Sequence, residues 1–111
     1  MVERVVDIDE ARSSILLPRT MKRRIECIIT GKVQGVFFRD FVKTKADLLG
    51  LFGFVKNDSG GAVTVIAEGE EEKLERFLEK IKAGTKYSKV EKVDAKWLDP
   101  QNEFSGFQIE F

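Results

Sequence analysis

The stretch GKVQGVFFR, which runs from Gly31 to Arg39, has the residue types of a phosphate-binding connection. Its two glycines let the backbone turn sharply and approach an anion closely. Between a strand and a helix, such a stretch points several N–H groups into one concavity, and the helix dipole adds partial positive charge. Arg39 supplies a planar, always protonated guanidinium that suits phosphate oxygens. The same pattern also fits a plain strand-to-helix loop with a surface arginine.

Asn57 is the second candidate for chemistry, because it stands where a strand-like run, Phe52 to Asn57, meets the turn sequence DSGG. An asparagine in this position is ordinarily part of the turn itself. In a functional role, the carboxamide of Asn57 would point into the space above the loop from Gly31 to Arg39. In a split βαβ fold the strand that ends at Asn57 lies near the first strand of the domain. The loop after that first strand and Asn57 can therefore meet.

Composition removes several function classes. The chain of 111 residues has no histidine and one cysteine, which excludes histidine metal sites, Ser-His and Cys-His couples, and an internal disulfide. Lys plus Arg and Asp plus Glu number 19 each, so the chain lacks the positive charge typical of binding to nucleic acids or anionic lipids. An apolar content of 42% suffices for the core of one domain.

Two periodicities along the chain predict the elements that must position these residues. Apolar residues alternate with polar ones in the predicted strands and recur at three- and four-residue spacing in the predicted helices. The predicted strands cover residues 23–30, 52–57, 63–68, 90–97 and 107–111, and the predicted helices cover residues 38–49 and 70–83. This order indicates an α+β, ferredoxin-like βαββαβ sandwich, with an antiparallel sheet and two helices on one face. We expect Cys27 to be a small buried hydrophobe.

The first twenty residues differ from the rest of the chain. We expect residues 1–20 to be an N-terminal extension of uncertain structure, and residues 21–111 to be the folded domain. The start of the chain lacks the apolar run of a signal peptide, and no segment has the length of a membrane span. We therefore expect a cytoplasmic protein.

Two motifs in this order resemble the signatures of the acylphosphatase family. GKVQGVFFR is similar to the first signature, and GFVKNDSGGAVTVIAEG, residues 53–69, is similar to the second. The second motif keeps the family spacing at Gly53, Asn57, Gly61, Val63 and Gly69. The resemblance covers residues 21–111, but the stretch 84–88 lacks the prolines often found after the second helix of the family.

The resemblance implies a small hydrolase that acts on acyl phosphates. It implies Arg39 and Asn57 as catalytic residues. The phosphate-binding loop would supply backbone donors from Lys32, Val33, Gln34, Gly35, Val36, Phe37 and Phe38. We expect no metal and no cofactor, since the leaving carboxylate needs no general acid and a neutral carboxamide can orient the attacking water. The expected partner is a small-molecule substrate, with no nucleic acid and no membrane, and the expected state is a monomer.

Three other interpretations fit parts of the sequence. An RNA-binding module is one, because Phe52-Gly53-Phe54-Val55 matches the centre of an RNA-recognition motif, but its flanking residues and its place on the second strand do not fit. A catalytically silent regulatory domain on the same scaffold is another. The third is an acylphosphatase-like domain of a hydrogenase-maturation protein. The chain stops right after the last predicted strand, which favours the free-standing form.

Overall fold

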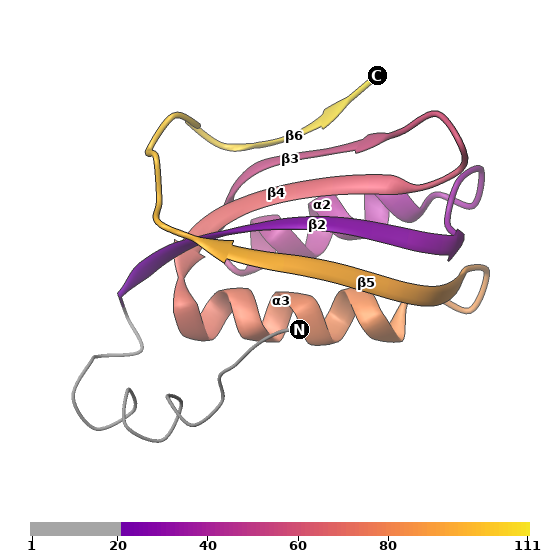
Figure 1. The fold of residues 1–111 in the computed structure, drawn as a ribbon, viewed down its shortest axis with the longest axis horizontal. Coiled ribbons are helices and arrows are strands. Elements are labelled where there is room, and N and C mark those ends of the chain that lie inside the picture. Colours follow the sequence, from indigo (N-terminus) through magenta and orange to yellow (C-terminus); the bar gives the residue numbers. More distant parts are fainter. Residues whose placement is uncertain (1–20) are drawn as a thin grey trace.

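The computed structural model describes residues 21–111, which form a sheet with two helices (Figure 1). The elements follow the predicted βαββαβ order, and a further strand, β6, follows β5. They are β2 (Lys22–Lys32), α2 (Phe38–Leu48), β3 (Phe52–Asn57), β4 (Val63–Glu70), α3 (Glu71–Ala83), β5 (Lys89–Leu98) and β6 (Phe107–Glu110). The expected extension, residues 1–20, lies outside the described residues. No helix within residues 21–111 is long and apolar enough to cross a membrane.

The sheet has the strand order β5-β2-β4-β3-β6. Every neighbouring pair is antiparallel except β3 and β6, which run parallel. The expectation of an antiparallel sheet is therefore wrong for β6, and the path of the chain gives the reason. Residues 99–106 carry the chain across one end of the sheet, from β5 to the opposite edge, and β6 then runs back beside β3 in the same direction (Figure 1).

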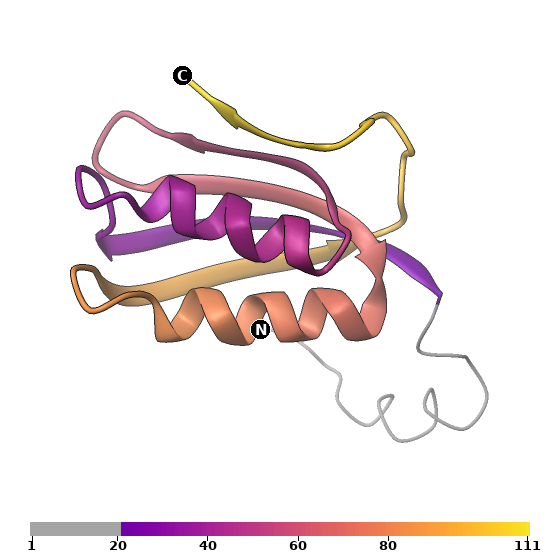
Figure 2. The same ribbon diagram turned by 180° about the vertical axis from the view of Figure 1, so that it is seen from behind.

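Both helices cover the same face of the sheet, as the sequence predicted (Figure 2). Alternate residues of the strands point to this face and meet the apolar stripe of each helix. Fully buried side chains of this core include Ile25, Cys27, Val42, Val65, Leu74 and Phe77. Burial raises the pKa of the Cys27 thiol to about 12, which keeps the thiol protonated and unreactive.

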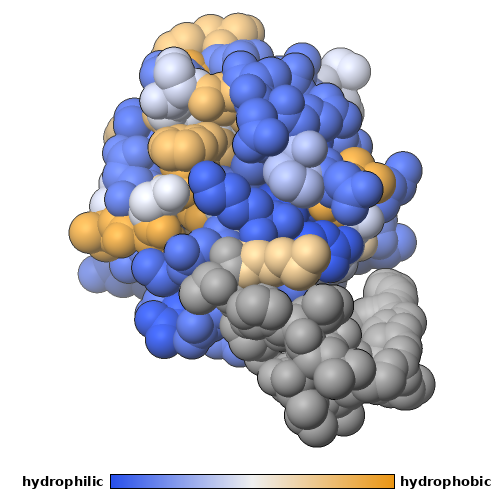
Figure 3. Space-filling model, turned by 90° about the vertical axis from the view of Figure 1, so that its left-hand side faces the viewer, coloured by the Kyte–Doolittle hydropathy of each residue, from blue (hydrophilic) through white to orange (hydrophobic). Residues whose placement is uncertain are grey.

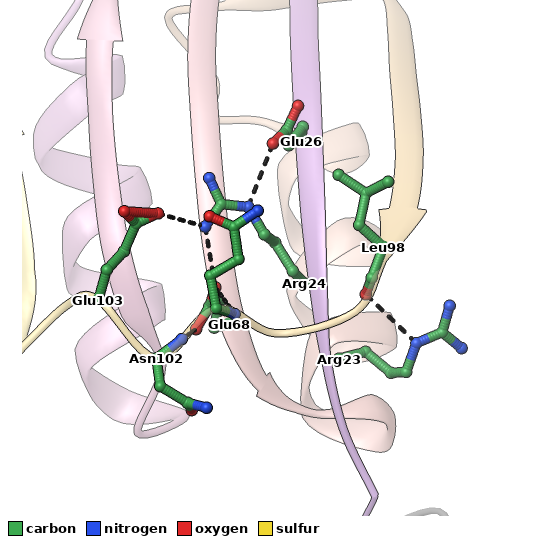
Figure 4. A network of polar contacts seen from close by, with 8 residues as sticks. Arg23, Arg24, Glu26, Glu68, Leu98, Asn102 and Glu103 are labelled. Carbon is green, nitrogen blue, oxygen red and sulfur yellow. Dashed lines mark hydrogen bonds and ion pairs between the residues drawn. The ribbon is translucent and has the colours of Figure 1, made fainter.

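A network of charged residues lies on the face of the sheet opposite the helices, at the start of β2 (Figure 4). The guanidinium of Arg24 donates from Nη1 to Glu68 at 2.9 Å and to Glu103 at 2.8 Å, and from Nε to Glu26 at 3.1 Å. Arg24 and Glu68 are both buried. The network thus ties the crossing segment 99–106, which contains Glu103, to β2 and β4.

The carboxylate of Glu68 is the acceptor for three donors. Its oxygens accept from the N–H groups of Gln101 at 2.8 Å and Asn102 at 3.0 Å, besides Arg24. Desolvation by burial opposes the charged form, but these hydrogen bonds and the charge of Arg24 outweigh it and lower the pKa of Glu68. The folded protein therefore stabilises the ionised form of Glu68 more than the unfolded chain does.

We predict that Glu68→Gln lowers the free energy of unfolding at pH 7 by about 1–3 kcal/mol, because Arg24 loses a charged partner inside the protein. Since the folded pKa lies below the unfolded one, the contribution of Glu68 is complete above the unfolded pKa and is lost as the pH falls through the folded pKa. Urea unfolding of both proteins at pH 7 and near pH 3 measures the difference, which should shrink in acid.

The matched control is Glu72→Gln, since Glu72 forms an exposed ion pair with Arg76 at 3.2 Å. This variant should change stability by no more than about 0.5 kcal/mol. A Glu68→Gln deficit of the same size at both pH values would contradict the assignment of the ionised carboxylate as the stabilising form.

Candidate active site

The connection from β2 to α2 begins at an irregularity in the sheet. The pairing of β2 with β5 shifts register between Thr30 and Gly31, and Gly31 has a φ of 127°. A Cβ atom at this position would overlap the carbonyl oxygen of Lys89 on the neighbouring strand. Only glycine fits there, and the bulge turns the chain out of the sheet toward the helix. Lys32, the first residue of the predicted phosphate-binding loop, still pairs with Lys89, so the free loop begins at Val33.

The loop leaves a row of backbone donors without protein partners. The N–H groups of residues 34–37 donate to no atom of residues 21–111. Positive φ angles at Gly35 (74°) and Phe37 (60°) alternate with Val36, which is the backbone alternation that forms anion-binding nests. No side chain in the described part of the chain caps the helix that follows, so its first-turn N–H groups also stay available. The buried side chains of Val33 and Phe38 fix both ends of the loop in the core.

Arg39 lies in the first turn of α2 and reaches the end of β6. Its Nη1 donates to the carbonyl oxygen of Glu110 at 3.1 Å, and its Cζ lies 4.8 Å from the ring centroid of Phe111. Within residues 21–111 this is the one hydrogen bond that the Arg39 side chain makes, so its other guanidinium N–H donors remain available to a ligand. The carbonyl and the aromatic ring together restrict where the guanidinium lies.

Asn57 is the last residue of β3, and its side chain is exposed. The parallel pairing of β3 with β6 places Lys56 beside Glu110, the residue whose carbonyl holds Arg39. Asn57 follows Lys56 directly, so Arg39 and Asn57 are brought to the same end of the sheet. The carboxamide of Asn57 makes no hydrogen bond to the described part of the chain, which leaves it able to bind a water molecule.

Gln34 joins the loop to the turn that follows Asn57. Its Nε2 donates to the carbonyl oxygens of Asp58 at 2.9 Å and Ala62 at 2.8 Å. The turn is closed by the N–H of Asp58, which donates to Ala62 at 2.8 Å, and by the hydroxyl of Thr64, which donates to the Asp58 carboxylate. The side chain of Gln34 therefore holds the loop and the end of β3 in one arrangement.

The sequence assigned only the backbone of Gln34 to the site and missed this side-chain role. A signal was present, because Gln34 is the one polar side chain in the run VQGVFF. A polar side chain in such a run needs a hydrogen-bonding partner when it is partly buried. The sequence did not identify that partner, since it lies more than twenty residues further along the chain.

The surface hollow at the other end of the sheet is separate from these residues. It has a volume of about 290 Å³, and its lining includes Leu49, Phe52 and Lys73. Figure 3 faces this end and shows hydrophobic residues interspersed with hydrophilic ones. Within residues 21–111, no group of three or more Cys, Asp and Glu side chains is arranged to hold a metal ion.

Fold and loop together define a ferredoxin-like α+β domain in which the connection between β2 and α2 has N–H groups, at residues 34–37, without partners in the described part of the chain. A sequence model of the acylphosphatase family matches residues 25–109. An acylphosphatase of Salinibacter ruber is 40% identical over 88 residues, which cover 79% of this chain and 93% of that protein. One of Helicobacter hepaticus is 44% identical over 94 residues, covering 80% and 98%. The chain belongs to the acylphosphatase family of hydrolases, as its two motifs indicated.

Solved structures agree with this assignment. The acylphosphatase of Bacillus subtilis superimposes with a TM-score of 0.78 at 37% identity, covering 80% of this chain and 99% of that one. The acylphosphatase of Coxiella burnetii gives a TM-score of 0.76 at 34% identity, covering 81% and 94%. Full-length HypF gives 0.75 at 32% identity, and the match covers 82% of this chain and 12% of HypF.

We predict that Gln34→Ala lowers kcat for acyl phosphate hydrolysis about 10- to 100-fold, because the loop and the end of β3 lose the bond that fixes their separation. The free energy of unfolding should fall by about 1–2 kcal/mol, since two carbonyl groups lose a donor. Steady-state kinetics with benzoyl phosphate and urea unfolding measure the two effects.

Gln101→Ala is the control for this variant. Gln101 is exposed at the opposite end of the sheet and contributes its backbone N–H to Glu68, which the substitution keeps. Both kcat and stability should match the wild type. Full activity of a folded Gln34→Ala protein would show that the two hydrogen bonds do not position the site.

Proposed function

We propose that this protein hydrolyses the carboxyl–phosphate anhydride of acyl phosphates to a carboxylate and inorganic phosphate. The backbone of the loop from Lys32 to Phe38 and the guanidinium of Arg39 bind the phosphoryl group, and Asn57 orients the attacking water. The observation that carries this proposal is the row of N–H groups at residues 34–37, which have no partner within residues 21–111 and are separated from Arg39 only by Phe38. Membership of the acylphosphatase family supports the same reaction.

Hydrolysis of an acyl phosphate requires the protein mainly to position the reactants and to stabilise negative charge. The oxygen of water attacks phosphorus while the bond from phosphorus to the acyl oxygen breaks, and the bonding electrons leave with the carboxylate. A carboxylate is a stable leaving group, so no general acid has to protonate it. The proton of the attacking water passes to a phosphate oxygen or to solvent. Catalysis then rests on stabilising the negative charge of the transferred group and on aligning the water.

The three groups divide these tasks. The loop N–H groups and the start of α2 present fixed partial positive charge to the phosphate oxygens. Arg39 adds a full charge, held in place by the Glu110 carbonyl and the Phe111 ring. The carboxamide of Asn57 is a poor base, but it offers both a donor and an acceptor, which suits it to orient one water molecule. Neither an arginine nor an amide changes charge near neutral pH, so the protein's own groups impose little pH dependence there.

We further propose that the reaction needs no metal ion, because the loop and Arg39 supply the positive charge that a cation would otherwise provide. We propose a monomer as the active form, with a small-molecule substrate and no nucleic acid; the balance of 19 basic and 19 acidic residues supports the absence of a nucleic-acid partner. The family model matches residues 25–109, which supports residues 21–111 as the catalytic domain and residues 1–20 as an extension. We also propose that the protein is located in the cytoplasm.

We predict that Arg39→Ala lowers kcat/KM for benzoyl phosphate by on the order of 10²–10⁵, as expected for loss of a charged donor to the transferred phosphoryl group. Arg39→Lys keeps the charge but loses the planar guanidinium, so its kcat/KM should fall between those of the wild type and Arg39→Ala. Steady-state hydrolysis assays with all three proteins measure these differences.

Arg76→Ala is the matched control, because Arg76 is an exposed arginine of α3 paired with Glu72. Its activity should equal that of the wild type. Addition of EDTA should leave the wild-type rate unchanged. An Arg39→Ala protein with near wild-type turnover would contradict the assigned role, and inactivation by EDTA that Mg²⁺ or Zn²⁺ restores would contradict metal independence.

We predict that Asn57→Ala lowers kcat by at least about 100-fold and changes the inhibition constant of inorganic phosphate much less, because the carboxamide aligns water and does not hold the phosphate. Asn57→Asp has nearly the same shape but brings a negative charge to the phosphate, so it should weaken phosphate binding as well. Equal losses of turnover and phosphate affinity in Asn57→Ala would make Asn57 a binding residue.

A further inference from the structure

Phe37 has an unfavourable backbone conformation, with φ 60° and ψ 25°, directly before α2. In this left-handed region the Cβ of a bulky residue crowds a neighbouring carbonyl, so glycine or asparagine normally occupies it. Gly35, two residues earlier, has a φ of 74° without that cost. The loop therefore carries an aromatic ring at a position where glycine would be more stable.

Burial of the ring does not offset this strain. The Phe37 residue is 79% exposed, whereas Val33 and Phe38 of the same loop are 1% exposed. The side chain makes no capping hydrogen bond, and the helix uses only the carbonyl oxygen of Phe37, which accepts from the N–H of Phe41 at 3.1 Å. Neither core packing nor helix capping explains the ring. Strain that stability does not require is characteristic of functional sites.

The position of the ring suggests its ligand. Phe37 lies in the proposed phosphate-binding loop, two residues before Arg39, and a second exposed aromatic residue, Phe111, lies against the Arg39 guanidinium. An acyl phosphate bound by its phosphoryl group in this loop must leave its acyl group outside the loop, since the backbone donors take only the anionic end. Exposed aromatic rings beside the loop offer that acyl group an apolar surface.

Given the proposed function, we infer that Phe37 is a specificity-determining residue that makes acyl phosphates with an aromatic or large apolar acyl group the preferred substrates. Its ring packs against the acyl group and adds binding energy that a small acyl group cannot gain. Acetyl phosphate, with its single methyl group, leaves most of the ring uncovered. The left-handed backbone of Phe37 is then the cost of placing an aromatic ring at the edge of the site.

The test compares kcat/KM for benzoyl phosphate and acetyl phosphate in the wild type, Phe37→Gly and Phe37→Trp. Glycine keeps the left-handed backbone and removes the ring, so the benzoyl-to-acetyl ratio should fall about 3- to 10-fold, chiefly through a higher KM for benzoyl phosphate. Tryptophan keeps an aromatic surface and should retain the ratio. The Tm of Phe37→Gly should be no lower than that of the wild type, because the strain is relieved.

Leu48→Ala is the control, since Leu48 is a similarly exposed apolar residue at the other end of α2, with 74% exposed. It should leave the ratio unchanged. An unchanged benzoyl-to-acetyl ratio in Phe37→Gly would overturn the inference. The proposed function would still stand in that case, provided that the wild type hydrolyses the substrates. Equal losses for both substrates with a lower Tm would also overturn it, because they indicate a structural role. A wild type that hydrolyses neither substrate would overturn the proposed function and this inference together.

Discussion

The proposed phosphate site rests on the backbone N–H groups of residues 34–37, which have no acceptor among the described residues. Backbone donors are normally paired in a folded protein, with protein or with water, so a consecutive unpaired row beside a helix start favours an anion. Gly31 creates this row by ending the regular ladder of β2 at a bulge, and the buried Val33 and Phe38 keep it from collapsing into the core. Arg39 then adds the full positive charge.

The two ends of the sheet have different tasks. At one end, Arg24 and Glu68 fasten the segment that carries the chain from β5 to β6. That crossing places β6 parallel to β3, and the carbonyl of Glu110 at the end of β6 holds Arg39. A charged network far from the loop thus helps to position the proposed catalytic arginine, through the path of the chain. Gln34 supplies the second connection, between the loop and the turn after Asn57.

Local sequence signals sufficed for the helices and the strands, because periodicity and glycine act over a few neighbouring residues. The same signals singled out Arg39 and Asn57 as candidates, and their roles stay proposals. The helix predicted from Phe38 onward begins at Phe38. The parallel pairing of β6, the partners of Gln34 and the Arg24 network were missed, since each joins residues that lie far apart in the chain. The left-handed backbone of Phe37 was missed for another reason: nothing in its residue type predicts that conformation.

A titration of the ¹⁵N-labelled protein with inorganic phosphate, followed by NMR, tests whether the loop, Arg39 and Asn57 share one phosphate site. We predict saturable shifts with one common affinity at the backbone N–H groups of residues 34–38, at the side-chain Nε–H of Arg39 and at the carboxamide of Asn57. The backbone amides of Gln101 and Asn102, which are bonded to Glu68 at the other end of the sheet, should not shift. Shifts confined to that other end, or loop shifts without any response from Arg39, would contradict a shared phosphate site.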